Sequence, residues 1–557
     1  MNNKSKWGFF ESFVSKFFSF FICLFFAVLL IASFVVFGYQ AYGKSAVDAG
    51  LQEAVQYSWM NPLKLLLTII LLVAIFFAVY FLSNILYKHW KNKEILNKKT
   101  FSIQKKVSIL VFGIIFFESA FINVFVPFEP AGDAAEIVNA TKNLGSLLSN
   151  SYYGSFPEKS GLPILLHYFS FVAGPLWTIV LVNMICAGSI ACWFCRTVWL
   201  LASGKISGKN LDQESSQKIS DMSMIACFFL IITFLPIVYF TGDLYPIIPY
   251  LCCVVGAIYF QLDYFYNSKF KYLVFSTLLL TLGYIIKSNT IIFVLAIMLV
   301  WFFHFVSQVR DRQIKVSKVI LTLVLMFFVI YIPGKGITTY VKVNNPYSVN
   351  PVHSTATFLA FGTSVPGITA DNNDPGWSYD AAWNAEDKQT QQDLLNKNLD
   401  YFKNNVGQIP MFLLKKDISQ WNNPTFGMNY VRQQVYDQSK TDSKIRNTVI
   451  AKESVWNGKI SVAENYYLNS LRILLLLGIV LFGGSILLSK KRVTLTRLSS
   501  QIAALGGIAF FTFWEAKDQS IFPFFCCLIP CAIVGISKLY SLLDIKFKKN
   551  NLKIEKS

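Results

Sequence analysis

The sequence has little charge for its length. Only 15% of its 557 residues are Asp, Glu, Lys or Arg, whereas soluble domains carry about 25%. Hydrophobic residues make up 54%, and Phe alone occurs 52 times. Apolar runs of about 18 residues or more recur along the chain, as in transmembrane helices. This composition excludes a soluble enzyme, a disordered chain and a collagen-like chain, and it predicts an all-α polytopic membrane protein.

Cysteine clusters and signature motifs are lacking too. All ten cysteines lie in or beside apolar runs, so neither a disulfide framework nor a zinc spacing is present. Cys192 and Cys195 form a C-x-x-C inside an apolar helix, a poor setting for redox chemistry. Gly-rich phosphate loops, H-E-x-x-H, G-x-S-x-G and dinucleotide fingerprints are missing. We therefore expect no cofactor, and an enzyme of this kind would take its donor from the membrane or from outside.

The net charge of +19 is explained by topology. Twelve spans are predicted, at 17–40, 62–87, 107–127, 175–201, 221–240, 245–262, 270–286, 288–306, 317–333, 469–488, 498–514 and 519–541. With the N-terminus inside, Lys and Arg concentrate on the cytoplasmic side, in the run 88–106, around 490–492 and in the tail 546–556. The short outer loops hold only Lys44, Lys64, Lys142, Lys159, Lys287 and Lys517. This asymmetry follows the positive-inside rule. It predicts a plasma-membrane protein with both termini cytoplasmic and no nucleic-acid partner.

Three polar regions interrupt the apolar pattern: 128–174, 334–468 and a short link from Glu515 to Gln519. They divide the chain into a transmembrane core (1–333) with the outer loop 128–174, an extracytoplasmic domain (334–468), and C-terminal transmembrane helices with a basic tail (469–557). The domain is long enough to bury a small core. Helices are predicted in it at 386–404 and 408–421.

The outer loop 128–174 is predicted to contain two helices. Pro130 and Gly132 stop the preceding span, and a new helix starts at Asp133. The run 162–174 is too short to span a bilayer. It is typical of a helix lying on the membrane interface, with His167 and Tyr168 near headgroup level.

Asp133 and Glu136 have two readings. Asp at a helix start with Glu three residues later is a capping box that satisfies backbone donors. The pair also suits a general base, because an attacking hydroxyl needs a carboxylate within hydrogen-bond reach. Both can hold, with Glu136 capping and Asp133 taking the proton.

Glu515, Lys517 and Lys287 lie in short links at the predicted outer face. Glu515 and Lys517 form either a solvated turn or a phosphate site in which Glu515 orients Lys517. Lys287 either snorkels to the interface or binds a lipid phosphate. A lysine ammonium is a compact point charge suited to phosphate.

Several stretches resemble the GT-C superfamily of membrane glycosyltransferases, which take a sugar from a polyprenyl-phosphate carrier. These are FEPAGDAAEIVNA (128–140), LPILLHYFSFVAGPLWTIVLVN (162–183), FTGDLYP (240–246) and FWEAKDQSIFPFF (513–525). The outer domain resembles a subgroup from Gram-positive bacteria through FLAFG (358–362), GWSYD (376–380) and LLKKDISQW (413–421). The likeness covers most of the chain. The double-acid pattern of the family is not matched, which argues against a required divalent metal.

The resemblance implies an inverting transfer on the outer membrane face, with Asp133 as the catalytic base. Polyprenyl phosphate leaves, and the acceptor is a glycan, a glycolipid or a protein of the cell envelope. The remaining implied residues bind substrates: Glu136, Lys287, Glu515, Lys517, Lys415, Lys416, Trp421 and Asp380.

Two other functions stay open. A transporter or flippase of lipid-linked glycans would be expected to show an internal repeat and polar residues inside its spans. A glycan polymerase of another fold usually relies on Arg and His, and this chain has only four His. A site joining Asp133, Lys517 and the outer domain would favour the transferase, whereas a cavity at the membrane midplane would favour the transporter.

Overall fold

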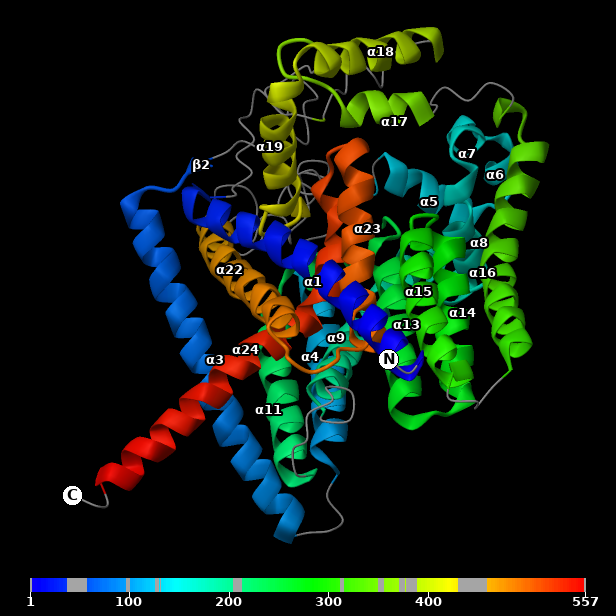
Figure 1. Cartoon of the computed structure of the whole chain (residues 1–557). Coiled ribbons are helices and arrows are strands. Elements are labelled where there is room, and N and C mark those ends of the chain that lie inside the picture. Colours follow the sequence, from blue (N-terminus) through cyan, green and yellow to red (C-terminus); the bar gives the residue numbers. More distant parts are fainter. Residues whose placement is uncertain are drawn as a thin grey trace.

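The structure of the chain is a computed structural model that describes residues 3–37, 58–96, 101–125, 130, 132–203, 213–310, 315–348, 355–369, 376, 388–428 and 458–554. It is a bundle of long helices with a helical layer over one end (Figure 1). Two-residue strands β1 (Val36–Phe37) and β2 (Ser58–Trp59) pair antiparallel, with Val36 opposite Trp59.

Within the described residues, nine helices are long and apolar enough to cross a membrane. They are α1 (Asn3–Val35), α3 (Pro62–Leu96), α4 (Ile103–Phe125), α9 (Ser170–Ala202), α13 (Ile247–Asn267), α15 (Thr290–Arg310), α16 (Val316–Asn344), α22 (Lys459–Leu487) and α24 (Asp518–Ile554). Each overlaps a predicted span. The chain is therefore an all-α polytopic membrane protein.

The other three predicted spans are shorter or interrupted. The helices α14 (Phe270–Ile286) and α23 (Ser499–Phe513) match their predicted bounds but have fewer than 18 residues. The predicted span 221–240 is not one helix, because α11 (Gln213–Ile231) stops at Ile231 and a short helix, α12 (Pro236–Tyr239), follows. Pro236 is the first residue of α12, where its missing N–H costs no hydrogen bond.

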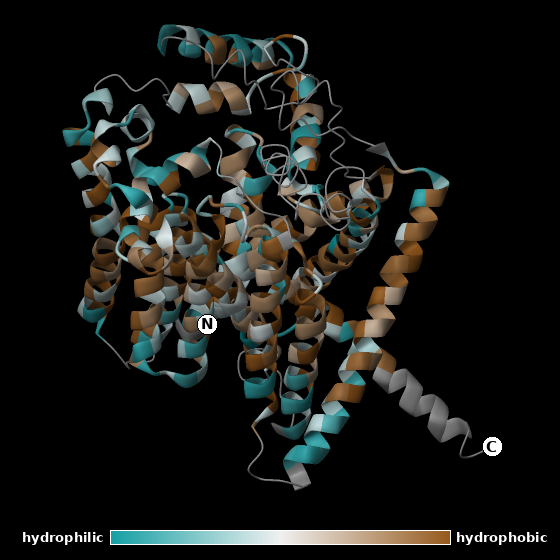
Figure 2. Cartoon of the chain, turned by 180° about the vertical axis from the view of Figure 1, so that it is seen from behind, coloured by the Kyte–Doolittle hydropathy of each residue, from teal (hydrophilic) through white to brown (hydrophobic). Residues whose placement is uncertain are grey.

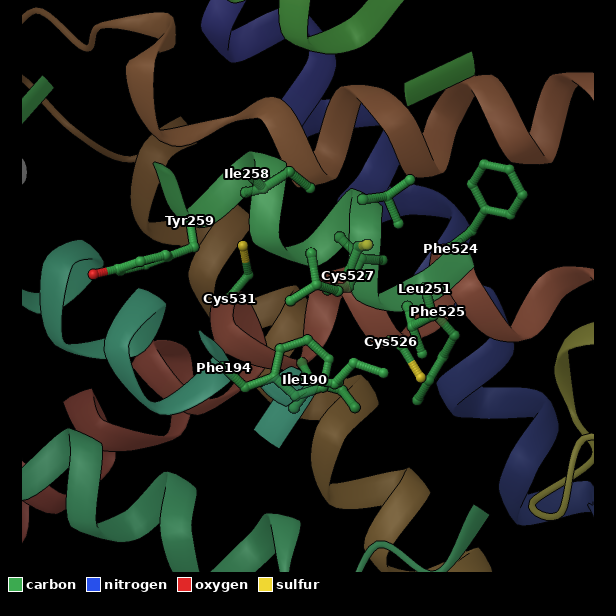
Figure 3. Close-up of a cluster of buried hydrophobic side chains, with 14 of the residues drawn as sticks. Ile190, Phe194, Leu251, Ile258, Tyr259, Phe524, Phe525, Cys526, Cys527 and Cys531 are labelled. Carbon is green, nitrogen blue, oxygen red and sulfur yellow. The ribbon is translucent and has the colours of Figure 1, made fainter. Parts of the chain in front are cut away.

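The centre of the bundle is formed by α9, α13 and α24 (Figure 3). Ile190 and Phe194 of α9, Leu251 and Ile258 of α13, and Phe524 of α24 are almost fully buried. Helices that are apolar on all sides are typical of such a core.

Helices α1, α3 and α16 lie at the periphery and expose apolar side chains, among them Phe17, Ile70 and Phe328. Figure 2 shows apolar residues through the middle of the bundle, with hydrophilic residues in the layer over one end and at the opposite tip of α3. Such faces are expected to contact lipid, which is as apolar as the side chains it meets.

Short helices gather at the end of the bundle that carries Asp133 (Figure 1, top). The first group is α5 (Asp133–Lys142), α6 (Ser146–Ser149), α7 (Ser151–Ser155), the 3₁₀ helix η1 (Pro157–Lys159) and α8 (Gly161–His167). The second is η2 (Pro346–Ser348), α17 (Thr355–Gly362), α18 (Lys388–Asn404), η4 (Val406–Gln408) and α19 (Ile409–Trp421). At the other end of α22, η5 (Leu495–Arg497) leads into α23.

The predicted interfacial helix is divided between α8 and the start of α9. A kink at Gly174 (φ 73°) separates residues 170–173 from the straight part of α9, which begins at Pro175 as predicted for that span. Tyr168 is well exposed and Phe171 is 85% exposed. Aromatic side chains on such a bend are suited to a membrane interface.

The polar region 334–468 is joined to the bundle by continuous helices. Helix α16 runs on to Asn344 and α22 begins at Lys459, so both ends of the region lie inside helices. The helices predicted at 386–404 and 408–421 are confirmed as α18 and α19. Phe361 and Leu395 form a small core between α17 and α18.

Candidate functional site

Helix α5 begins at Asp133, as predicted, but the capping box is not formed. The N-cap is Gly132 (φ 51°), and no side chain caps the helix. The Glu136 carboxylate instead accepts a hydrogen bond of 2.6 Å from the amide of Asn150. Asn150 is the N-cap of α7 and accepts from the backbone N–H of Tyr152. Glu136 therefore holds α7 in place, and the Asp133 carboxylate is not used to cap the helix.

The Asp133 carboxylate forms an ion pair with Lys159. The Lys159 ammonium donates to Oδ2 of Asp133 at 2.9 Å. The Asp133 side chain is 45% exposed and the Lys159 side chain 21% exposed. The pair joins α5 to η1 across the loop that carries α6 and α7. Asp133 is thus open to a ligand on one side and held by a cation on the other.

Aromatic rings surround the Lys159 ammonium. It lies 4.3 Å from the ring centre of Phe156, 4.8 Å from that of Tyr152 and 5.7 Å from that of Tyr245. The next element is fixed by a close contact, because a Cβ on Gly161 would overlap the carbonyl oxygen of Ile285 at the end of α14. Only glycine permits such an approach. The contact brings the segment after Lys159 to the link that carries Lys287.

The turn 240–246, one of the stretches that resemble the GT-C superfamily, forms another wall of the site. Asn183 of α9 donates to the carbonyls of Thr241 and Asp243, and Asn123 of α4 donates to the Thr241 hydroxyl. The two intramembrane asparagines therefore anchor the turn. Asp243 is nearly buried, and burial raises its pKa to about 6.

Lys287 and Lys159 both lie close to Tyr245. The Lys287 ammonium is 4.7 Å from the centre of the Tyr245 ring, whose face attracts cations. Burial and the charges of Lys159 and Lys517 together lower the pKa of Lys287 to about 8, against the opposing charges of Glu515 and Asp243. Lys287 is thus one of three lysines that share a site.

Lys517 completes the cluster through its charge. Burial raises the pKa of Asp133, but the charge and hydrogen bond of Lys159 and the charge of Lys517 outweigh it, so the pKa lies below its usual value. Glu515 acts on the same groups, since its charge counters the effect of Lys517 on Lys287. The structure therefore brings together Asp133, Lys287, Lys517 and Glu515, which the sequence pointed to, with Lys159, which it did not single out.

Lys416 does not join the lysine cluster; its side chain has a structural role. It is fully buried, and its ammonium donates to the carbonyls of Gly362 (2.5 Å), Thr512 (2.9 Å) and Trp514 (2.7 Å). Three acceptors match the three N–H groups of an ammonium. They lie at the ends of α17 and α23, where a cation is favoured by the helix dipole. Lys416 thus ties the layer over the site to the bundle.

The other predicted residues of the 334–468 region lie away from Asp133 or outside the described residues. Trp421 is buried against Phe25 and Phe26 of α1. Lys415 is exposed on α19. Asp380 lies outside the described residues.

The motifs quoted from this region nevertheless meet the link that carries Glu515 and Lys517. A Cβ on Gly362 would overlap the carbonyl oxygens of Phe513 and Trp514. Gly376 (φ 80°) accepts a hydrogen bond from the Ala516 N–H at 2.9 Å, and its open Cα face lies against the Lys416 side chain. FLAFG, the start of GWSYD and LLKKDISQW therefore converge on the backbone next to Lys517.

An apolar groove of about 740 Å³ lies between α4 and residues 235–238. Its lining includes Ile114, Phe117, Phe121 and Val238. The groove lies along α4, and α12 at its other wall leads into the turn 240–246.

The part of the chain that the structure describes contains no group of three or more His, Cys, Asp or Glu placed to hold a metal ion. The acids at the site are each matched by lysine. Asp133 pairs with Lys159, and Asp243 and Glu515 lie in the field of Lys287 and Lys517. Lysine is therefore the group available here to meet a negatively charged ligand.

No family model, no curated protein and no solved structure matches this chain. The function therefore has to be inferred from the residues and their geometry.

Proposed function

We propose that this chain is an inverting glycosyltransferase of the GT-C type, which moves a sugar from a polyprenyl-phosphate carrier to an acceptor of the cell envelope. One observation carries the proposal. A partly exposed carboxylate, Asp133, stands among three lysines from separate links, at one end of a membrane bundle. On this proposal that end faces outward from the plasma membrane.

Each feature of the site has a part in such a reaction. The acceptor hydroxyl attacks the anomeric carbon of the sugar and loses its proton to Asp133. The bond from that carbon to the phosphate oxygen breaks, and its electron pair leaves with polyprenyl phosphate. Attack from the face opposite the phosphate inverts the anomeric centre. Lys287, Lys517 and Lys159 stabilise the charge that develops on the phosphate, which is the largest contribution such sites make.

The apolar groove supports a lipid-linked donor. A polyprenyl chain is a long hydrocarbon, and the groove along α4 offers it an apolar surface. Because lipid is as apolar as the groove, the groove positions the chain and adds little hydrophobic free energy. The phosphate at the end of the chain would meet the lysine cluster, and the sugar beyond it would meet Asp133.

The test is transfer by purified protein in nanodiscs, with a panel of synthetic polyprenyl-phosphate sugars and cell-envelope extracts as acceptors. Asp133→Asn keeps the shape of the side chain and removes the base, so we expect transfer to fall by about two to four orders of magnitude. The cost to folding is small, because Asp133 is not the N-cap and a charge in the first turn contributes about 0.3–1 kcal/mol.

Asp393→Asn is the matched control. Asp393 is exposed on α18, and its change removes the same charge from the layer over the site. It is expected to transfer sugar like the wild type. Wild-type transfer by Asp133→Asn would remove Asp133 from the mechanism, and failure of the wild type with every donor would argue against the function itself.

A further inference from the structure

The ion pair between Asp133 and Lys159 conflicts with the role of general base that the proposed function gives to Asp133. A base must accept a proton, and a carboxylate that already receives a hydrogen bond from an ammonium at 2.9 Å is a weak proton acceptor. Burial alone would make Asp133 a stronger base, since burial raises its pKa. Lys159 is the largest of the influences that oppose this effect. Something must therefore weaken the pair before transfer.

Lys159 is held in a way that allows it to change partners. Its ammonium lies over the rings of Phe156, Tyr152 and Tyr245. Contacts to ring faces do not bind each N–H in a set direction, unlike the three carbonyls that hold Lys416. The Lys159 and Lys287 ammoniums both lie over the Tyr245 ring, so an anion at Lys287 would attract Lys159 as well.

We propose that Lys159 gates Asp133, so that the donor's phosphate draws the Lys159 ammonium away from the carboxylate and Asp133 becomes a competent base only in the donor complex. The inference rests on the proposed function and adds the regulation of the same site. It predicts ordered chemistry, with the base activated by the substrate whose leaving group Lys159 stabilises. Lys159 is then a positioning residue for Asp133 and a binding residue for the phosphate.

Other titratable groups also face Asp133 and enter the design of the test. They come from α7, η1, the turn 240–246 and the link before α24: Tyr152, Tyr153, Lys159, Asp243, Tyr245 and Lys517. Glu158, Lys287 and Glu515 act on these groups in turn. The tyrosines have raised pKa values and stay neutral. Lys287 titrates near pH 8 and Asp243 near pH 6. Experiments near pH 5 therefore leave Lys287 charged and need a control for Asp243.

The first test compares two pH profiles of the wild type. The profile of kcat/KM for the donor reports the free enzyme, and that of kcat reports the substrate complex. Gating predicts that the acidic limb lies at higher pH in kcat, because Asp133 has lost its ammonium partner there. In Lys159→Gln the two limbs should coincide, whereas Lys159→Arg should keep them apart. Coinciding limbs in the wild type, or separate limbs in Lys159→Gln, would overturn the gate.

The second test does not depend on turnover. The probe is a polyprenyl methyl phosphate, a phosphodiester that carries one charge and does not titrate in this range. Calorimetry near pH 5 in two buffers of different ionisation enthalpy measures the protons taken up on binding. We expect uptake by the wild type, by Asp243→Asn and by Lys142→Gln, which alters an exposed lysine on the same helix as Asp133.

Uptake should disappear in Asp133→Asn and in Lys159→Gln. Binding without uptake in the wild type, or uptake that persists in Lys159→Gln, overturns the gate and leaves the glycosyltransferase proposal intact. If the wild type does not bind the phosphodiester at all, the proposed function fails and the gate fails with it. A melting temperature for each variant shows that the compared proteins are folded.

Discussion

If Lys287 binds the donor phosphate as proposed, donor binding should depend on pH on the alkaline side. Its pKa is lowered to about 8 by burial and by the neighbouring lysines. The ammonium is charged below this value and loses its charge as the pH rises through it, while the phosphodiester of the donor keeps its single charge. Donor affinity in the wild type is therefore expected to fall above about pH 8. Equilibrium binding of the same phosphodiester probe across the pH range measures it.

Lys287→Arg should remove this alkaline fall, because a guanidinium stays charged throughout. Lys517→Arg is the matched variant, since it makes the same replacement at the other lysine and leaves Lys287 to titrate. Lys517→Arg should bind the probe more weakly, because a guanidinium differs in shape from an ammonium, but its affinity should still fall near pH 8. If donor affinity still falls at alkaline pH in Lys287→Arg, another group causes the fall and Lys287 is not part of the phosphate site.

The sequence pointed to part of this site. Asp133, Lys287 and Lys517 stand out because they are charges in short links on a chain that keeps most of its charge at the opposite end. Lys159 belongs to the same group of lysines, but nothing in the residues around it fixes its neighbours. Its place depends on Gly161 lying against the carbonyl of Ile285, which is far along the chain. Lys416 is the opposite case. The sequence pointed to it as a binding residue, but the structure encloses it with three carbonyls, which nothing in the sequence indicates.

At the scale of elements, the contact between α8 and α14 sets the position of Lys159. Gly161→Ala would place a methyl group on the Ile285 carbonyl oxygen, and the backbone would have to move. Overpacking of this kind costs about 1–3 kcal/mol. We expect a lower melting temperature and a raised KM for the donor, since η1 would shift Lys159 away from Asp133 and Tyr245.

Gly484→Ala is the control for this change. Gly484 lies inside α22, and a Cβ there meets nothing within 4 Å. Alanine is favoured over glycine in a helix by about 1 kcal/mol, so stability should be equal or higher and donor KM unchanged. A Gly161→Ala protein with wild-type melting temperature and KM would show that the link does not need the close contact.

The elements were predictable where the pattern is local. The start of α5 follows from Gly132 and Asp133, and α18 and α19 follow from the periodicity of their own residues. The break between α11 and α12 was missed because most of residues 221–240 are apolar, and apolarity alone does not separate one helix from two. The ends of 334–468 show the same limit, since α16 and α22 extend beyond their apolar parts into polar sequence.

At the scale of the whole molecule, sidedness determines whether the site can meet its donor. Lysine and arginine are concentrated at the ends remote from Asp133, as with Lys88, Lys91 and Lys93 in the last turns of α3, at its far tip (Figure 1). By the positive-inside rule, we propose that those ends lie in the cytoplasm and the Asp133 end outside. The proposed transfer on the outer membrane face requires this orientation.

Labelling of single introduced cysteines tests the orientation. None of the ten native cysteines is exposed, so the unmodified chain gives a low background. Gln392→Cys places a thiol on exposed α18, above the site, and Lys490→Cys places one in the exposed link after α22. With the Asp133 end outside, an impermeant maleimide labels Gln392→Cys in intact cells and labels Lys490→Cys only after the membrane is opened. The reverse pattern would turn the lysine cluster toward the cytoplasm, away from the outer leaflet, and the proposed transfer there could not take place.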